Sequence, residues 1–244
     1  MCTLIVCRQA HPRFPLIIVS NRDEFYARPS APPALVKHGD RSIVSPRDLE
    51  RGGTWMGVAS GGWFVGLTNQ DDGMHLQGRD SRGKVVDALL KMNDIDEAEW
   101  YVNACVGSNY NPFNVVFGTS HDMRIGMVHG DFTMVAPIKQ SVTVVANDCT
   151  FNAAYAHRQA AAQSSVMRAL RHEKLVPSSF KRTLSLHVNH DDPYQSVCVH
   201  DQEKKFGTVS SSVVTVSSSG DISYAYADGP ACQLNRQKST LRFK

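Results

Sequence analysis

The chain has 244 residues, of which 42% are hydrophobic and 20% are charged, and its formal net charge is +3. This ordinary composition excludes an intrinsically disordered protein, and the small net charge gives no reason to expect electrostatic binding to nucleic acids. No apolar run reaches the length of a membrane helix, and the amino-terminal residues lack the pattern of a secretory signal.

Two apolar runs near the amino terminus, residues 3–7 and 15–20, predict strands that are covered on both faces. The second run stops at four polar residues, Asn21-Arg22-Asp23-Glu24. Charged side chains in such a place are rarely buried unless they are paired or functional. Residues 27–53 are rich in proline, glycine and charge and show no clear period, so we expect a long surface segment there.

The middle of the chain contains one hairpin pattern and several helical patterns. Runs 54–58 and 63–68 flank a glycine turn and predict a β-hairpin. Residues 84–92 and 95–105 predict two helices, the second of which is acidic in its first turn, as the helix dipole favours. Residues 151–173 are rich in alanine and predict the longest helix.

The second half of the chain also contains strand-like runs, at 114–118, 124–128, 132–136, 142–146, 196–200, 211–216 and 222–227. The first four of these predict a continuous meander. The basic run from Arg236 to Lys244 is expected to be a solvated and partly frayed tail. Because strands cluster rather than alternate singly with helices, the pattern predicts one α+β domain over residues 1–244, with helices stacked on antiparallel sheets.

The six cysteines show no CxxC spacing, and several lie within apolar runs. We therefore expect reduced, buried thiols in a cytoplasmic protein. The ten histidines are scattered, and the only close pair, His187 and His190, is expected to lie in an exposed loop. Neither distribution predicts a metal site.

Cys2 follows the initiator methionine, which is generally removed before a small residue such as cysteine. Removal exposes a free α-amine on the residue that carries the thiol, and this amine can act as the general base for its own thiol. An α-amine is less basic than a lysine side chain, so it can be unprotonated near neutral pH. A nearby guanidinium favours the thiolate, and amide side chains stabilise the oxyanion of an acyl transfer.

Other strand ends supply the remaining parts of such a site. Arg22 and Asp23 end the strand that follows the Cys2 strand, so tight antiparallel pairing would bring them beside Cys2. Asn69 and Asn147 each follow an apolar run, and although each alone is more often a turn residue, strand ends of this kind suit convergence on one edge of a sheet. The candidate catalytic residues are Cys2, Arg22, Asp23, Asn69 and Asn147, with no metal ligand.

Six segments carry a resemblance to a known family. They are MCTLIV (1–6), SNRDEFYARP (20–29), GGTW (52–55), GLTN (66–69), NPFNVV (111–116) and the stretch from SVCVH to FGTVSSSVVTV (196–216). In this order, over nearly the whole chain, they resemble the NRDE family, which is the transport and Golgi organisation protein 2 family. The segment VVANDCTFN (144–152) is more similar to the corresponding segment of penicillin V acylases and bile-salt hydrolases.

The resemblance implies the N-terminal-nucleophile hydrolase fold, an αββα sandwich of two stacked, mainly antiparallel sheets with helices outside. In those enzymes an exposed N-terminal cysteine cleaves an amide with the help of an arginine, an aspartate and two asparagines, and the five candidates above occupy the matching positions. The enzymes space their arginine and aspartate as R-N-x-D, whereas Arg22 and Asp23 are adjacent, so either Asp23 or Glu24 could take the carboxylate role. No residue matches the second, late arginine of the bile-salt hydrolases.

Two functions follow from the resemblance. The first is an N-terminal cysteine amidohydrolase or acyltransferase that acts on an acyl amide or thioester and needs no cofactor. Family members have been linked to haem mobilisation and to lipid or acyl-CoA homeostasis, so the second is a non-enzymatic protein that binds haem, a lipid or acyl-CoA in the same cleft. Haem needs only one or two axial ligands, and the sequence offers no specific anchor for it. Neither function calls for nucleic acid or an integral membrane segment.

Overall fold

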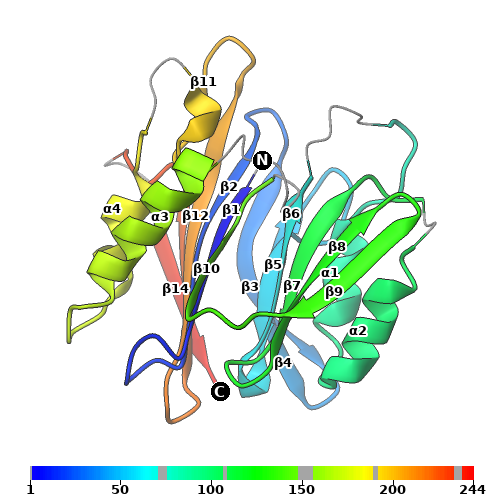
Figure 1. The fold of residues 1–244 in the computed structure, drawn as a ribbon, viewed down its shortest axis with the longest axis horizontal. Coiled ribbons are helices and arrows are strands. Elements are labelled where there is room, and N and C mark those ends of the chain that lie inside the picture. The colour runs from blue at the N-terminus through cyan, green and yellow to red at the C-terminus, as the bar shows by residue number, and fades with distance from the viewer. Residues whose placement is uncertain (1, 71–75, 107–108, 148–155, 189–191, 234–237) are drawn as a thin grey trace.

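The computed structural model describes residues 2–70, 76–106, 109–147, 156–188, 192–233 and 238–244 (Figure 1). Their strands are β1 (Cys2–Arg8), β2 (Leu16–Phe25), β3 (Ser30–His38), β4 (Arg41–Asp48), β5 (Met56–Ala59), β6 (Trp63–Asn69), β7 (Phe113–Gly118), β8 (Met123–His129), β9 (Phe132–Pro137), β10 (Val142–Val145), β11 (His200–Asp201), β12 (Phe206–Val216), β13 (Ile222–Asp228) and β14 (Lys238–Phe243). Their α-helices are α1 (Gly83–Leu89), α2 (Ile95–Asn103), α3 (Ala156–Ala169) and α4 (Lys181–Leu184). None of these helices is long and apolar enough to cross a membrane.

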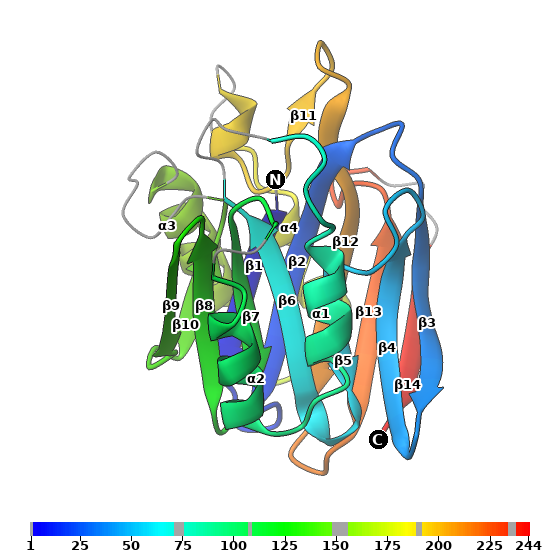
Figure 2. The same cartoon turned by 90° about the vertical axis from the view of Figure 1, so that its right-hand side faces the viewer.

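The described strands form two antiparallel sheets of seven strands each. The first sheet has the order β10-β1-β2-β12-β13-β14, with β11 paired to β12, and the second runs from β3 to β9 in sequence order. The sheets stack face to face, with α3 and α4 outside the first sheet and α1 and α2 outside the second (Figures 1 and 2). The predicted αββα sandwich is therefore confirmed.

Strand β1 and the first part of β2, residues 16–19, are apolar at nearly every position because both of their faces are covered. Alternate residues such as Leu4 and Ile18 pack between the two sheets. Their neighbours Ile5 and Val19 pack against the helices on the outer side. This division matters for the site, because successive side chains of a strand point to opposite faces of its sheet.

Two segments that showed no strand pattern in the sequence contain strands, although most of β3 is exposed, as predicted for residues 27–53. Residues 27–53 contain the hairpin of β3 and β4, and the alternation of β3 is obscured because its pairing slips at a bulge between Ala31 and Ala34, where the chain carries two prolines. The basic carboxyl-terminal run is not a frayed tail over its described part, because residues 238–243 form the edge strand β14, which pairs with β13. Exposed edge strands are commonly rich in charge, so their sequences read as polar tails.

Other predicted elements differ in extent or connection. The strand at 142–146 does not continue the meander but crosses to the first sheet, where β10 pairs with β1. The strand at 15–20 continues as β2 through Asn21-Arg22-Asp23-Glu24 to Phe25. The run 196–200 contributes only the start of β11, and the described part of the predicted helix 151–173 is α3, since residues 151–155 lie outside the described ranges.

Candidate active site

Antiparallel pairing of β1 with β2 places the first described residue of the chain opposite the charged end of β2. The register pairs Cys2 with Arg22 and Thr3 with Asn21. Because directly opposed residues project from the same face, the Cys2 thiol and the Arg22 guanidinium both lie on the side of the first sheet that faces the second sheet. The antiparallel pairing of β1 and β2 thus brings the predicted nucleophile, Cys2, beside the predicted cation, Arg22.

The Arg22 side chain is buried between the sheets. Its guanidinium lies 4.4 Å from the ring centroid of Trp55, in a cation–π arrangement, and its Nη2 lies 3.8 Å from a carboxylate oxygen of Glu24. The other terminal nitrogen, Nη1, is buried and has no hydrogen-bond partner among the described residues. A buried guanidinium nitrogen without a partner is costly, so it marks a position where a ligand acceptor would be stabilising.

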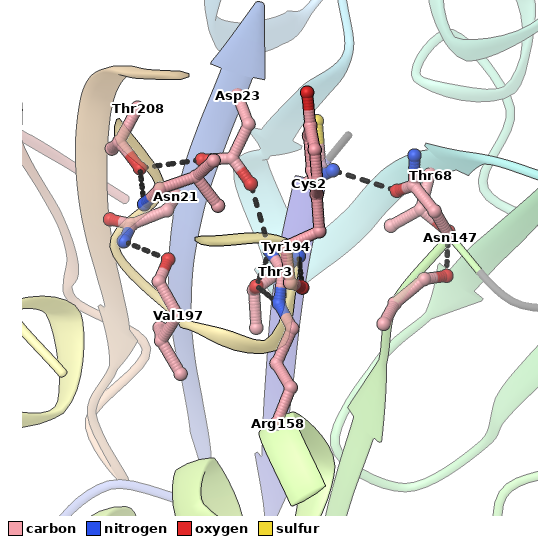
Figure 3. Close-up of polar contacts among 12 residues, drawn as sticks. Cys2, Thr3, Asn21, Asp23, Thr68, Asn147, Arg158, Tyr194, Val197 and Thr208 are labelled. Carbon is pink, nitrogen blue, oxygen red and sulfur yellow. Dashed lines mark hydrogen bonds and ion pairs between the residues drawn. The ribbon is translucent and has the colours of Figure 1, made fainter. Parts of the chain in front are cut away.

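Asp23 points to the opposite face of β2, towards α3, where it is fully buried. One of its carboxylate oxygens accepts a hydrogen bond from Arg158 Nη2 at 2.8 Å, and the other accepts one from Thr208 Oγ1 at 2.6 Å. Arg158 extends from α3 and also donates to the hydroxyl of Thr3, as Figure 3 shows. This network fixes the two strands directly behind Cys2, and it distinguishes Asp23 from Glu24, which lies nearer the surface and pairs with Arg22 and Arg28.

Asn147 lies just after β10, on the other side of β1. Its Oδ1 accepts a hydrogen bond from the Cys2 nitrogen at 2.7 Å (Figure 3). The neighbouring carbonyl of Ala146 accepts hydrogen bonds from Thr68 Oγ1 at 2.8 Å and from Asn114 Nδ2 at 3.3 Å, which tie this segment to the second sheet. Asn147 is therefore held in place by both sheets and orients the nitrogen of Cys2.

Cys2 opens onto a pocket of about 350 Å³, which we call the Cys2 pocket. It is bounded by the ends of β2 and β6 and by residues 76–83, and it includes Asn69 at the end of β6. Arg22, Asp23 and Glu24 also line it. The structure therefore brings all five predicted site residues together. Asn69 comes from the second sheet, and Asn147 contacts Cys2 by accepting a hydrogen bond from the Cys2 nitrogen through its Oδ1.

The surroundings of Cys2 act on its thiol in both directions. Burial raises the pKa of the thiol above its ordinary value, and the negative charge of Asp23 raises it further. A hydrogen bond from the backbone N–H of Asp23 and the positive charge of Arg22 lower it. For Asp23 itself, burial raises the pKa, while the Arg158 guanidinium and the Thr208 hydroxyl act to lower it. The Cys2 thiol therefore depends on nearby hydrogen bonds and charge to become a thiolate.

Arg158 was missed by reasoning from sequence. It is fully buried, and it shares one face of α3 with Ala162, Val166 and Ala169. A cation at helical spacing within an apolar face is the signal that could have found it, because a buried arginine requires an acidic or polar partner.

Residues 1–226 match the family model described as Transport and Golgi organisation 2. The human Transport and Golgi organization protein 2 homolog is 36% identical over 106 residues, which cover 41% of this chain and 37% of the human protein. The Drosophila melanogaster Transport and Golgi organization protein 2 is 26% identical over 261 residues, which cover 89% of this chain and 88% of that protein. The alignment with the human relative thus spans little more than a third of its length.

Two solved structures share the fold. A variant of the conjugated bile acid hydrolase from Clostridium perfringens has a TM-score of 0.61 at 11% identity and covers 99% of this chain and 92% of its own. The Caenorhabditis elegans ortholog of N-acylethanolamine-hydrolyzing acid amidase has a TM-score of 0.58 at 15% identity and covers 87% of this chain and 92% of its own. At these identities the likeness establishes the N-terminal-nucleophile hydrolase fold and leaves the activity to be argued from the site.

Proposed function

Because the chain belongs to the Transport and Golgi organisation 2 family and has the N-terminal-nucleophile hydrolase fold, we propose that it is an N-terminal cysteine hydrolase or acyltransferase that acts on an acyl amide or thioester. The observation that carries this proposal is the position of Cys2. The Cys2 nitrogen donates a hydrogen bond to Asn147 Oδ1 at 2.7 Å. Cys2 also pairs with Arg22 across β1 and β2, and both residues line the Cys2 pocket.

The first step requires removal of Met1, which lies outside the described residues. The free α-amine of Cys2, which donates one N–H to Asn147 Oδ1, then accepts the thiol proton. The sulfur attacks the substrate carbonyl carbon, forming a C–S bond and an oxyanion. When the oxyanion collapses, the bond to the leaving nitrogen or sulfur breaks, the α-amine returns the proton to that atom, and a thioester on Cys2 remains. Water or another acceptor then attacks this thioester and restores the thiol.

The oxyanion needs donors that are already in place before the reaction. Arg22 supplies a buried Nη1 that has no partner among the described residues, on the same face of the sheet as the thiol. Asn69 lines the pocket from the second sheet and is the predicted second donor. The Asp23 carboxylate does not contact the substrate in this scheme, because it is hydrogen-bonded to Arg158 and Thr208. The backbone N–H of Asp23 stabilises the thiolate by a hydrogen bond. Asp23 is a positioning residue.

The lining of the Cys2 pocket favours a polar substrate. It contains five arginines and five acidic residues, while Trp55, Leu67 and Leu76 are the only large apolar side chains among its described lining. Such a surface can hydrogen-bond an amide and a charged group close to it, whereas haem and long acyl chains require extensive apolar contact. The described lining also contains no histidine, so Cys2 is the only side chain there of a type that commonly ligates haem. These features fit the alternative haem carrier poorly.

The state of the amino terminus provides the decisive test. Intact mass of protein purified from its own host is expected to show loss of Met1, and a reagent selective for 1,2-aminothiols, such as 2-cyanobenzothiazole, is expected to label one site. Cys2→Ala should abolish this labelling and the turnover of a panel of acyl amides and thioesters. Cys105→Ala, which changes a buried cysteine in the helical layer outside the second sheet, serves as the matched control.

Two results would contradict the proposal. Retention of Met1 in the native protein would remove the base, and unchanged turnover by Cys2→Ala would remove the nucleophile. A haem Soret band that forms on titration and depends on one residue, in a protein without hydrolytic activity, would favour the haem carrier instead. The cytoplasmic location expected from cysteine usage stays a prediction.

A further inference from the structure

A second group of reactive side chains lies apart from the lining of the Cys2 pocket. His187, Cys198, His200 and Cys232 each offer one nitrogen or sulfur atom, and these four atoms all lie within 4.8 Å of one another. They come from three separate parts of the chain: the segment after α4, the bend before β11 together with the first residue of β11, and the turn after β13. We propose that these residues, which we call the Cys198 cluster, bind a structural zinc ion.

The identity of the four donors indicates the metal. Two cysteine sulfurs and two histidine nitrogens are a ligand set that zinc binds in tetrahedral structural sites. A two-iron cluster with the same ligands separates the cysteines on one iron from the histidines on the other. Here His200 Nε2 lies beside both sulfurs, at 3.5 Å from Cys198 Sγ and 3.2 Å from Cys232 Sγ. Mixed contacts of this kind favour a single ion.

The distances between donors also match a tetrahedron around zinc. With Zn–S bonds of about 2.3 Å and Zn–N bonds of about 2.0–2.1 Å, tetrahedral geometry places two sulfurs about 3.8 Å apart and a sulfur and a nitrogen about 3.6 Å apart. The two sulfurs of the cluster are 3.7 Å apart, and one sulfur–nitrogen distance is 3.5 Å, while the other is a few tenths of an ångström shorter. A disulfide needs about 2.05 Å between its sulfurs, so the two cysteines are not bonded to each other.

The spacing of the ligands explains why this site is not predicted from the sequence. Cys198 and His200 are two residues apart, where a bend leads into β11, and Cys198 Sγ lies 3.5 Å from His200 Nε2. His187 and Cys232 join them only through the fold, and the rings of His187 and His200 lie 5.3 Å apart. The predicted exposure of His187 is confirmed, while its predicted partner His190 lies outside the described residues. Long separations replace the short CxxC spacing by which zinc sites are recognised.

The Cys198 cluster is connected to the network behind Cys2. The N–H of Val199, between two of the ligands, donates to Thr208 Oγ1 at 2.9 Å, and Thr208 in turn donates to Asp23. Asn21 Nδ2 donates to the carbonyls of Leu184 and Val197, on either side of the segment that holds His187. A zinc ion would therefore fasten this end of the first sheet, which lies at the same end of the molecule as the amino terminus (Figure 1).

Metal analysis of the full chain tests the site. Protein without a polyhistidine tag, purified under reducing conditions, equilibrated with Zn²⁺ and then freed of loose metal, is expected to hold about one zinc per chain. X-ray absorption should find two sulfur and two nitrogen ligands at about 2.3 Å and 2.0–2.1 Å. Cys232→Ser should weaken zinc binding by more than about 100-fold, since even a hydrogen-bonding partner behind a zinc ligand contributes 10- to 100-fold.

Matched variants separate ligand loss from general damage. Cys105→Ala removes a buried cysteine elsewhere and is expected to retain its zinc, as is His172→Ala, which removes an exposed histidine. His187→Ala removes an exposed ligand with little risk to folding and should weaken zinc binding. A folded chain that binds no zinc, equal zinc affinity in Cys232→Ser and Cys105→Ala, or a Cys198–Cys232 disulfide under reducing conditions would each overturn the proposal.

Discussion

Arg22 and Asp23 are adjacent in sequence but lie on opposite faces of β2. Arg22 projects between the two sheets, where it contacts Trp55 and opposes Cys2. Asp23 projects towards α3, where it meets Arg158. The strand alternation that separates them gives each a different effect on Cys2. The positive charge of Arg22 lowers the pKa of the thiol, and we propose that it also stabilises the oxyanion. Asp23 instead links the strands behind the thiol through Arg158 and Thr208.

Replacement of Arg158 should be strongly destabilising. Arg158→Met leaves the Asp23 carboxylate buried without its cation, and loss of one partner of a buried ion pair costs about 3–5 kcal/mol. Chemical denaturation at neutral pH measures this loss. Arg168→Met, which removes an exposed arginine from the last turn of the same helix, is the control and should change stability by less than about 0.5 kcal/mol.

The pH dependence of Arg158→Met identifies the cause. Burial already raises the folded-state pKa of Asp23, and loss of the Arg158 cation raises it further above the unfolded value, although the Thr208 hydroxyl still acts to lower it. The folded variant then binds a proton more tightly than the unfolded chain. Its loss of stability relative to the unsubstituted protein should therefore shrink as the pH falls towards the ordinary carboxyl range. The double variant Asp23→Asn/Arg158→Met should recover part of the loss at neutral pH. A deficit that is independent of pH would mean that packing, rather than the buried charge, is responsible.

The fold was largely predictable, because its central strands carry unmistakable apolar runs and its hairpins carry glycine turns. Strand alternation after residue 20 was harder to read, since the polar residues Asn21 and Asp23 are buried by partners on distant segments. No local pattern shows that Arg158, 135 residues away, satisfies Asp23. The same holds for the Cys198 cluster, whose members meet only when α4, β12 and β13 have packed. Cys2 and Arg22 were predictable because a single tight strand pair joins them.

The guanidinium of Arg22 should make Cys2 more reactive. Its positive charge lowers the thiol pKa, although burial raises it more. Arg22→Met should therefore move the midpoint of Cys2 alkylation by iodoacetamide to higher pH and slow labelling at neutral pH. Arg22→Lys retains the positive charge and should restore part of the rate. Mass spectrometry of the amino-terminal peptide measures the labelling. The control Arg47→Met removes an exposed arginine and should leave the midpoint unchanged. An unchanged midpoint in Arg22→Met as well would refute the role of Arg22.

Asn147 should matter to turnover more than to substrate binding. Its Oδ1 accepts the Cys2 N–H, so Asn147→Ala frees the amine that is proposed to carry the proton. We expect kcat for a cleaved amide to fall by about 10²- to 10³-fold, a loss typical of one preorganised hydrogen-bonding group, with little change in KM. Asn103→Ala, at the exposed end of α2, is the control. A rise in KM with unchanged kcat would assign Asn147 to substrate binding instead.

The ion pair between Arg28 and Asp48 should make stability depend on acid pH. Burial raises the pKa of Asp48, but hydrogen bonds from Arg28 and from the backbone at Glu50 and Arg51 outweigh this and hold it below its ordinary value. The stabilisation is therefore present above the unfolded-state pKa of about 3.9 and is lost as the pH falls through the lower folded-state value. Its size should be about 1 kcal/mol, because both side chains are partly exposed.

Asp48→Asn should flatten the acid limb of the stability profile, measured by urea denaturation across pH. Asp87→Asn removes the partner of the more exposed Arg47 and should leave that limb nearly unchanged. Equal profiles for the two variants would show that the Arg28–Asp48 pair contributes nothing measurable.

The glycine pair before Trp55 gives a test of how the Cys2 pocket is built. Gly52 and Gly53 both have positive φ, at +67° and +78°. A β-carbon on Gly52 would meet nothing within 4 Å, whereas one on Gly53 would lie 2.6 Å from the backbone carbonyl carbon of Gly83, at the start of α1. Gly52→Ala should cost only the left-handed backbone penalty of about 1–2 kcal/mol. Gly53→Ala adds a collision with backbone that cannot move aside cheaply.

We therefore expect Gly53→Ala to lower the melting temperature well beyond the roughly 2–8 °C that 1–2 kcal/mol produces in a chain of this size. The collision would also push Thr54 and Trp55 away from α1, since the Thr54 N–H bonds to the Gly83 carbonyl at 3.4 Å. Trp55 stacks on Arg22, so the alkylation of Cys2 should slow in Gly53→Ala and stay normal in Gly52→Ala. Equal melting temperatures and equal alkylation in the two variants would show that the close contact between Gly53 and Gly83 does not shape the pocket.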